Sequence, residues 1–390
     1  MKSAYNETGL YNLAVLKETK RWLKQHFIED ERFQKIKEAH VSPFYHPNFV
    51  IRVLLFVATL FALSGVTGIL SLMALGVDEG DIFLSFCCIF YGVGSFIFLE
   101  KVFIESNHHY KSGVNEALIY HACCFTIGGV MGVSDFDPHM GLFASFIILT
   151  FAAIRYLDLV CTIAATLAFA GILFYEFYNI GGIFQQIIPF VFLTFFTPLY
   201  FFVKRLKGKS ELKFWSNNLL IVEGLSLLFI YIAGNYLVVR ELSVEMMDLN
   251  LEEGADIPFA FIFYGLTVLI PLAYLYFGIK NNDIVLIRVS LIVIAFSVFT
   301  FKYYYSLGHP EITLTVAGLI LLAVSILLLN YLKTPKHGFT RENLLTEKWA
   351  NMNAEAFIIS QTMGGNQVTV KEEFKGGGGG FGGGGATGGY

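Results

Sequence analysis

Charged residues are scarce in this chain of 390 residues. Asp, Glu, Lys and Arg together make up 15% of the sequence, against about 25% in an ordinary soluble domain. Hydrophobic residues reach 55%, aromatic residues reach 16%, and the mean hydropathy is +0.61. The composition therefore excludes an ordinary soluble domain and indicates a chain that lies mostly in a membrane.

Cysteine is also scarce, and its positions exclude a disulfide framework. All five cysteines lie inside apolar stretches, where neutral thiols behave as small hydrophobic side chains. They are Cys87, Cys88, Cys123, Cys124 and Cys161. The cysteines therefore carry no information about the redox state of the compartment.

Sequence motifs of several functional classes are missing. The chain has no HExxH motif, no serine in a strand–turn–helix elbow, and no loop on the basic side long enough for a catalytic domain. Strands of about ten residues with alternating polarity, which would indicate a β-barrel, are also lacking. We therefore expect no enzyme, no cofactor and no metal centre, and no partner among nucleic acids, because membrane topology accounts for the basic residues.

The chain does contain ten apolar stretches that are long enough, or nearly long enough, to cross a bilayer as α-helices. They cover residues 53–76, 82–99, 114–133, 141–153, 157–174, 180–203, 215–238, 257–277, 284–300 and 312–332. The fourth stretch is short, and is either a thin span or, with the fifth, half of a re-entrant hairpin, which would leave eight spans. We predict an all-α, polytopic transmembrane helix bundle.

The distribution of Lys and Arg sets the expected orientation. If the chain alternates sides at each span, 24 of the 27 basic residues lie on one face, with Arg240 and Lys302 on the other and Arg288 inside a span. Basic residues concentrate on the cytoplasmic side, whereas acidic residues contribute little to orientation. We expect both termini in the cytoplasm and, in a bacterium, an inner-membrane protein whose acidic face is periplasmic.

The two ends of the chain differ in composition from the membrane domain, which we place at 50–332. Residues 1–49 are polar, show no cleavable signal peptide and predict a helical hairpin at 12–26 and 30–40. This hairpin is either a docking module or a basic hairpin that rests on anionic headgroups. After the last span, 333–363 predicts a cytoplasmic amphipathic segment. In the tail, 364–390, 11 of the last 15 residues are glycine, so we expect disorder.

Two segments resemble known bacterial membrane proteins. Residues 13–40, with Trp22, Leu23, Ile28, Glu29, Glu31 and Phe33 ahead of many spans, resemble the start of an uncharacterised family of polytopic bacterial membrane proteins that share a domain of unknown function. The ending FKGGGGGFGGGGATGGY is similar to the glycine-rich tail of TPM-domain proteins, although no TPM domain is present. The first resemblance implies a multi-pass bacterial membrane protein, and neither implies a catalytic residue.

Four ionisable residues inside the predicted spans are the candidate functional site. Glu116, His121, Glu223 and Arg288 all follow the expected cytoplasmic start of a span by a few residues. A charged group at mid-membrane costs about 2.5–3.5 kcal/mol on insertion scales unless it is paired or hydrated. One interpretation is a shared wet cavity in which Arg288 neutralises a glutamate and His121 changes protonation. In the other, Glu116 and Arg288 snorkel to the interface and Glu223 makes one interhelical hydrogen bond.

Three asparagines near the same helix starts would add polar lining to such a cavity. They are Asn115, Asn217 and Asn218. The sixth stretch contains Gly181, Gly182, Gln185, Gln186, Pro189 and Pro198, so its backbone is either interrupted beside a cavity or simply kinked. A third feature, the GxxxG spacing of Gly128 and Gly132, favours close helix packing within the chain.

On the acidic face, Asp135, Asp137 and His139 have the spacing of metal ligands. Pro138 interrupts the set, and no further ligand follows at a diagnostic spacing. We interpret this segment as a solvated turn.

Two functional hypotheses follow from these features. The first is a carrier-like or channel-like protein that moves a small solute or ion past Glu116, His121, Glu223 and Arg288. The second is a non-transporting membrane scaffold that recruits proteins through its cytoplasmic ends. In both, the lipid bilayer is the partner that the sequence predicts directly.

Overall fold

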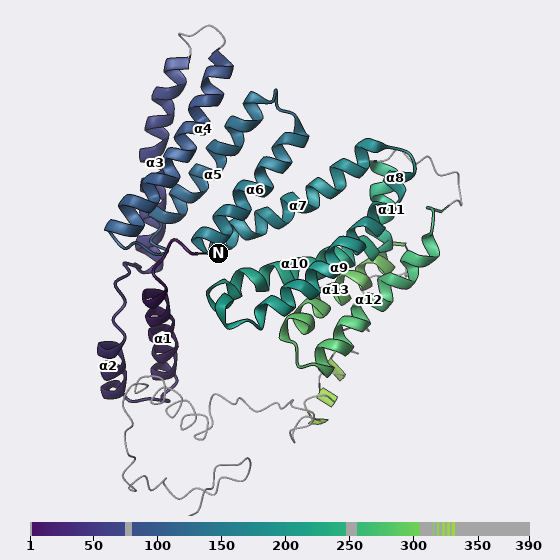
Figure 1. Cartoon of the computed structure of the whole chain (residues 1–390). Helices are drawn as coiled ribbons and strands as arrows, with labels where there is room; N and C mark the ends of the chain where they lie inside the picture. Colours follow the sequence, from purple (N-terminus) through teal and green to yellow (C-terminus); the bar gives the residue numbers. More distant parts are fainter. Residues whose placement is uncertain are drawn as a thin grey trace, which may run out of the picture. The chain divides into compact units, whose positions relative to one another are not determined.

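The computed structural model describes residues 2–74, 80–246 and 256–304, together with nine positions between 315 and 331. All the regular elements in this part of the chain are helices (Figure 1), with one isolated β-bridge between Tyr45 and His109. The predicted all-α class is confirmed. The chain divides into two units, of which one comprises 1–6 and 44–313 and the other contains the N-terminal hairpin, 7–43.

Nine helices in the described part of the chain are long and apolar enough to cross a membrane. They are α3 (Phe49–Ala74), α4 (Gly80–Phe98, continued by the π-helical η1, Leu99–Ser106), α5 (Val114–Val133), α6 (Pro138–Tyr156), α7 (Leu159–Ile180), α9 (Ile188–Lys207), α10 (Ser216–Gly234, preceded by the 3-10 turn η2, Ser210–Trp215), α12 (Ala260–Lys280) and α13 (Ile284–Tyr304). The chain is a multi-pass membrane protein. The predicted tenth span, 312–332, lies largely outside the described residues, as do the segments 333–363 and 364–390 entirely.

The fourth and fifth predicted spans both form full-length helices. The 13 apolar residues of 141–153 are the middle of α6, which has 19 residues, and α7 has 22. Asp137 starts α6 by accepting a hydrogen bond from the backbone N–H of His139 at 3.1 Å, and Asp158 starts α7 by accepting one from Cys161 at 2.8 Å. Both helices exceed the roughly 17 residues that a span needs, so the eight-span alternative is not favoured.

The predicted interruption of the sixth span lies in a turn rather than inside a helix. Gly181 and Gly182 have φ values of +76° and +59° and turn the chain after α7, which is a backbone conformation that glycine adopts readily. The four-residue α8 (Ile183–Gln186) follows, and α9 then begins with Pro189 in its first turn. Pro198 lies inside α9, which continues through it. No discontinuous span is therefore present in this part of the structure.

The predicted seventh span, in contrast, ends early because Asn235 breaks the helix. Its side chain is fully buried and donates to the hydroxyls of Tyr231 at 2.9 Å and Thr300 at 3.0 Å. It also caps α11 (Tyr236–Glu245) by accepting a hydrogen bond from Val238. The apolar sequence continues past Asn235, but the helix does not.

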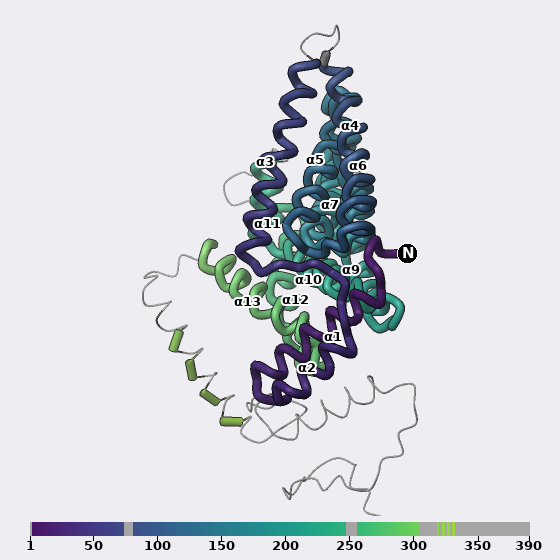
Figure 2. Tube along the Cα trace, turned by 90° about the vertical axis from the view of Figure 1, so that its left-hand side faces the viewer, coloured from purple at the N-terminus to yellow at the C-terminus, as the bar shows by residue number. Residues whose placement is uncertain are grey.

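Neighbouring spans pack mainly in sequence order. The helices α3 to α6 run lengthwise beside one another in Figures 1 and 2, and α5 packs against α3, α4 and α6. Further along, α10 packs against α7, α9, α12 and α13 around a core that includes Phe196. The ring of Phe229 stacks on that of Phe196 with a centroid distance of 4.6 Å. The two regions are joined where Trp215, at the start of α10, donates to the carbonyl of Ile154 near the end of α6 at 2.9 Å.

The N-terminal hairpin consists of α1 (Glu7–Lys24) and α2 (Asp30–Ala39), so the predicted pair of short helices is confirmed. Asn12 of α1 donates to the carbonyl of Val41 at 2.8 Å, and its Oδ1 lies 3.2 Å from the His40 ring. The hydrogen bonds therefore tie the end of α2 back to α1. Residues 2–6 belong to the membrane unit instead, because Ala4 donates to the carbonyl of Arg155 at 2.8 Å.

Candidate functional site

Ion pairs between neighbouring helices gather at one end of the membrane helices, which we name the basic rim. The pairs are Arg52–Glu116 at 2.5 Å, Arg155–Glu100 at 2.8 Å, Lys204–Asp283 at 2.8 Å and Lys207–Glu223. Each joins a basic residue near the start or end of one helix to a carboxylate on another helix or turn at the same end of the bundle. Most of the charge that the spans carry is therefore neutralised locally.

Glu116 has a local structural role in this rim. Its carboxylate pairs with Arg52 and accepts a hydrogen bond from the backbone N–H of Gly113 at 2.7 Å, which caps the start of α5. A carboxylate at a helix N-terminus is further stabilised by the helix dipole. Its partner is therefore Arg52 on α3, and the pairing with Arg288 that the sequence suggested is not seen.

His121 lies on α5 between aromatic rings. Its side chain is 8% exposed and packs edge-on against Tyr91 at 4.8 Å and beside Phe125 at 4.2 Å. The Nε2 atom has no hydrogen-bond partner among the described residues. Because α5 packs against α3, α4 and α6 whereas α10 packs against α13, Glu116 and His121 belong to a different part of the bundle from Glu223 and Arg288.

Glu223 lies on α10 and is almost completely buried, with 1% of its side chain exposed. It is paired with Lys207 at the end of α9, whose side chain is 28% exposed. The two helices form an antiparallel hairpin, so the end of α9 lies beside the start of α10. This contact is an interhelical hydrogen bond, as one sequence interpretation predicted, and it is also an ion pair.

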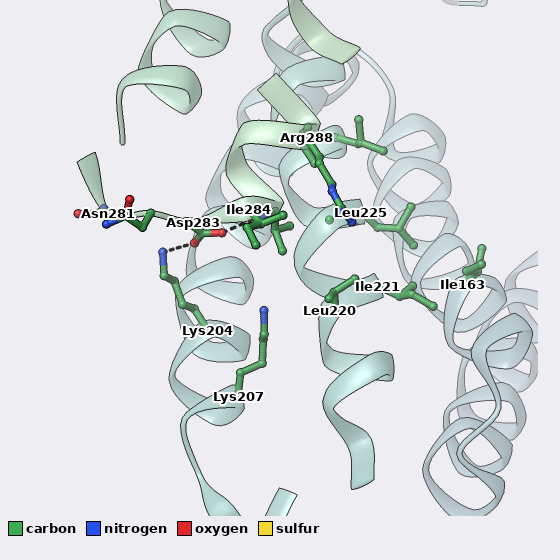
Figure 3. A pocket seen from close by; sticks show the side chains of 15 residues that line it. Ile163, Lys204, Lys207, Leu220, Ile221, Leu225, Asn281, Asp283, Ile284 and Arg288 are labelled. Carbon is green, nitrogen blue, oxygen red and sulfur yellow. Dashed lines mark hydrogen bonds and ion pairs between the residues drawn. The ribbon is translucent and has the colours of Figure 1, made fainter. Parts of the chain in front are cut away.

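Arg288 differs from Lys204 and Lys207 because it has no ion pair within 4.0 Å among the described residues, and it is exposed. It reaches from α13 toward Leu225 of α10 (Figure 3) and lines a cavity of about 930 Å³ together with Lys204 and Lys207. We name this cavity the Arg288 pocket. Its walls are α9, α10, α13 and the turn between α12 and α13, with Ile163 contributed by α7.

Asp283 holds one corner of the Arg288 pocket. It caps α13 by accepting a hydrogen bond from the backbone N–H of Val285 at 3.0 Å, and it also accepts one from Lys204 at 2.8 Å. Burial raises the pKa of the Asp283 carboxyl, but these hydrogen bonds and the lysine charge outweigh it and hold the pKa below its usual range. The carboxylate is therefore charged at neutral pH, and it holds Lys204 in the wall of the pocket.

Two of the asparagines that we expected to line a cavity instead form hydrogen bonds to the ends of helices or to the turns beside them. Asn218 donates to the hydroxyl of Thr162 at 2.6 Å and to the carbonyl of Asp158 at 3.0 Å. Asn115 donates to the carbonyl of His109 at 2.9 Å. Both are buried, whereas Asn217 is exposed, and none of the three lines the Arg288 pocket.

Two residues of the turn that contains Asp135, Asp137 and His139 have other roles in the structure. Asp137 caps α6, and the Nδ1 atom of His139 is in hydrogen-bond contact with the carboxylate of Glu176 on α7. In the described part of the chain, no group of three or more His, Cys, Asp or Glu residues is placed to hold a metal ion.

The sequence interpretation missed three residues of the pocket, namely Lys204, Lys207 and Asp283. The two lysines lie three residues apart, which places them on one face of a helix end, but the orientation rule alone already accounts for them. Asp283 directly precedes a span, which is the position of a helix cap. These signals identify a polar helix end, although the pairing with Glu223 depends on the three-dimensional structure.

Comparison with known proteins assigns no family to this chain. No model of a protein family, no curated protein and no solved structure matches the chain.

Proposed function

We propose that the protein is a carrier-like membrane protein that binds an anionic solute in the Arg288 pocket. The observation that carries the proposal is the unpaired Arg288, because the other basic residues of the pocket have carboxylate partners. Basic residues inside spans are rare, face a cavity or a partner, and mark solute pathways. A cation in an apolar-walled cavity favours an anion, since the low local dielectric strengthens their attraction.

The Lys207–Glu223 pair supports the same proposal by fixing the pocket's second cation. Glu223 is inaccessible and keeps Lys207 at the pocket wall. Glu223 therefore acts as a positioning residue and does not itself carry a proton or a solute. In this proposal Glu116 and His121 stabilise the neighbouring part of the bundle.

Flux measurements in proteoliposomes test the carrier proposal. The probes are radiolabelled inorganic phosphate, radiolabelled glycerol 3-phosphate and fluorescent phosphatidylglycerol, and we expect at least one to cross faster than in protein-free vesicles. Arg288→Gln should lower that flux about tenfold or more, because a hydrogen bond to a charged group contributes about 1.5–3 kcal/mol. The control is Lys302→Gln, which removes an exposed cation near the other end of α13 and should leave the flux unchanged.

Two results would overturn the proposal. One is flux no higher than in empty vesicles for all three probes with correctly folded protein. The other is a flux that Arg288→Gln and Lys302→Gln leave equally intact.

We also propose that the chain lies in a bacterial inner membrane with both termini and the basic rim in the cytoplasm. The support is that alternation of the ten predicted spans puts 24 of 27 basic residues on one side, together with the likeness of 13–40 to a bacterial membrane family. Reporter fusions after Gly208 and after Asp137 test this orientation. We expect cytoplasmic activity at Gly208 and periplasmic activity at Asp137, and activity on the same side at both positions would contradict it.

A scaffold is the second candidate, because the hairpin 7–43 belongs to a different compact unit of the chain from the described membrane helices. The flux assay separates the two functions. A carrier that lacks the hairpin keeps its Arg288-dependent flux, whereas a scaffold shows no flux with or without the hairpin.

A further inference from the structure

The walls of the Arg288 pocket are mostly apolar. On α10, Leu220, Ile221, Leu225 and Leu228 follow one helix face, so they form a stripe about 12 Å long at 1.5 Å per residue. Gly224 lies within this stripe, and a Cβ built there meets nothing within 4 Å. The stripe therefore borders open space that a hydrocarbon chain fills well and a small hydrated anion does not.

Three hydrophobic side chains that line the pocket are exposed. The exposed fractions of Ile163, Leu220 and Ile284 are 39%, 45% and 63%. On a membrane helix such side chains face the hydrocarbon of the bilayer. A ligand can therefore reach the pocket sideways from the lipid, with its polar part held by the basic residues of the pocket.

The charges of the pocket fit a ligand with a single negative charge. Lys204, Lys207 and Arg288 carry three positive charges, and Asp283 and Glu223 neutralise two of them. One positive charge remains, on Arg288, near the start of a span. A phosphodiester carries one negative charge, and the arginine fork binds phosphate oxygens in pairs.

The volume also exceeds what a small inorganic anion needs. A cavity of about 930 Å³ lies at the upper end of the range for sites that enclose a drug-sized ligand, about 300–1,000 Å³. Basic pockets between transmembrane helices on the cytoplasmic side are sites where phospholipid headgroups bind.

We infer that the ligand of the Arg288 pocket is an anionic phospholipid, whose phosphodiester lies against Arg288 and Lys207 and whose acyl chain lies along the stripe of α10. The inference rests on the pocket of the proposed function and names its substrate class. Recognition then has two parts, which are a charge contact at Arg288 and Lys207 and an apolar contact at Leu220, Gly224 and Leu225.

Lipid binding to the purified full-length protein tests the inference. The protein in neutral detergent is titrated separately with phosphatidylglycerol, phosphatidylcholine and glycerol 3-phosphate, and bound ligand is measured by native mass spectrometry. We expect phosphatidylglycerol to bind at least tenfold more tightly than the zwitterionic lipid, and free glycerol 3-phosphate to bind weakly because it lacks the acyl chain.

Two substitutions test the charge contact and the apolar contact separately. Arg288→Gln should weaken phosphatidylglycerol binding about tenfold while leaving phosphatidylcholine unchanged. Gly224→Phe fills the apolar space without altering any charge and should weaken phosphatidylglycerol binding to a similar degree. The matched control is Gly128→Phe on α5, which also faces open space but lies outside the pocket, and it should bind like the wild type.

The outcomes separate the lipid inference from the proposed function. Equal affinity for the two lipids, or unchanged phosphatidylglycerol binding in Gly224→Phe, overturns the lipid ligand. Arg288-dependent binding and flux of glycerol 3-phosphate without lipid binding overturns the lipid but keeps the carrier. Arg288-dependent phosphatidylglycerol binding without flux of any probe keeps the lipid site and overturns the carrier. Because Arg288 is exposed, its substitution also serves as the test if Gly224→Phe fails to fold.

Discussion

Replacing Lys207 with methionine is expected to destabilise the protein by about 3–5 kcal/mol, because it leaves a buried carboxylate without its partner. The side chain of Glu223 is 1% exposed, so water cannot replace the lost ammonium group. Glu223→Gln should cost less. In that variant the unpaired group is Lys207, which is 28% exposed at a helix end and can extend to the interface.

The double variant Lys207→Met/Glu223→Gln supplies the control. With both charges removed, the desolvation penalty of the pair disappears together with its attraction, so the stability should return to within about 1–2 kcal/mol of the wild type. Reversible unfolding of the three variants in mixed detergent micelles measures the differences. Equal losses in the two single variants, or additive losses in the double variant, would show that Glu223 is not a buried carboxylate that depends on Lys207.

The sequence predicts only part of the candidate site. Glu223 and Arg288 are recognisable because a charge inside an apolar stretch is rare and costly. The sequence places them at a similar depth. In the structure Arg288 lines the pocket, whereas Glu223 is buried and is paired with Lys207, which also lines it. The sequence also suggests that Glu116 shares a cavity with Glu223 and Arg288, but the depth of a residue along its helix does not determine which helices are neighbours. Glu116 pairs with Arg52, which is 64 residues away in the chain.

The fold is predicted well where hydropathy determines it and poorly where backbone hydrogen bonding does. The third and ninth predicted spans begin at the same residues as α5 and α13, because a polar turn directly precedes the apolar stretch in both. The seventh continues to 238 on hydropathy alone, whereas the helix stops at Asn235. A buried asparagine offers hydrogen bonds that compete with the helix, and its partner Thr300 lies on another span, so the break depends on tertiary structure.

In helix α5, too, the sequence alone does not predict which residues contact the neighbouring helix. The spacing of Gly128 and Gly132 predicted a close contact through these two glycines, but the structure places Gly128 toward open space. Gly129 and Gly132 face α4 instead, where Ser85 lies against both. A Cβ at Gly129 would lie 2.6 Å from the Ser85 carbonyl oxygen and 2.8 Å from the Ile89 backbone nitrogen. A sequence motif gives a spacing, but it does not tell which of two adjacent residues faces the partner helix.

Gly129→Ala is therefore expected to destabilise the protein by about 1–3 kcal/mol, the usual cost of overpacking a tight contact. The added methyl group meets the backbone of α4, so the two helices must move apart. Gly128→Ala should instead be neutral or stabilise by up to about 1 kcal/mol, because alanine favours the helix interior over glycine. Both changes add the same atoms to adjacent positions of one helix, so the difference between them isolates the packing term. Thermal unfolding in detergent measures it, and equal transition temperatures for the two variants would contradict the close approach of α4 and α5 at Gly129.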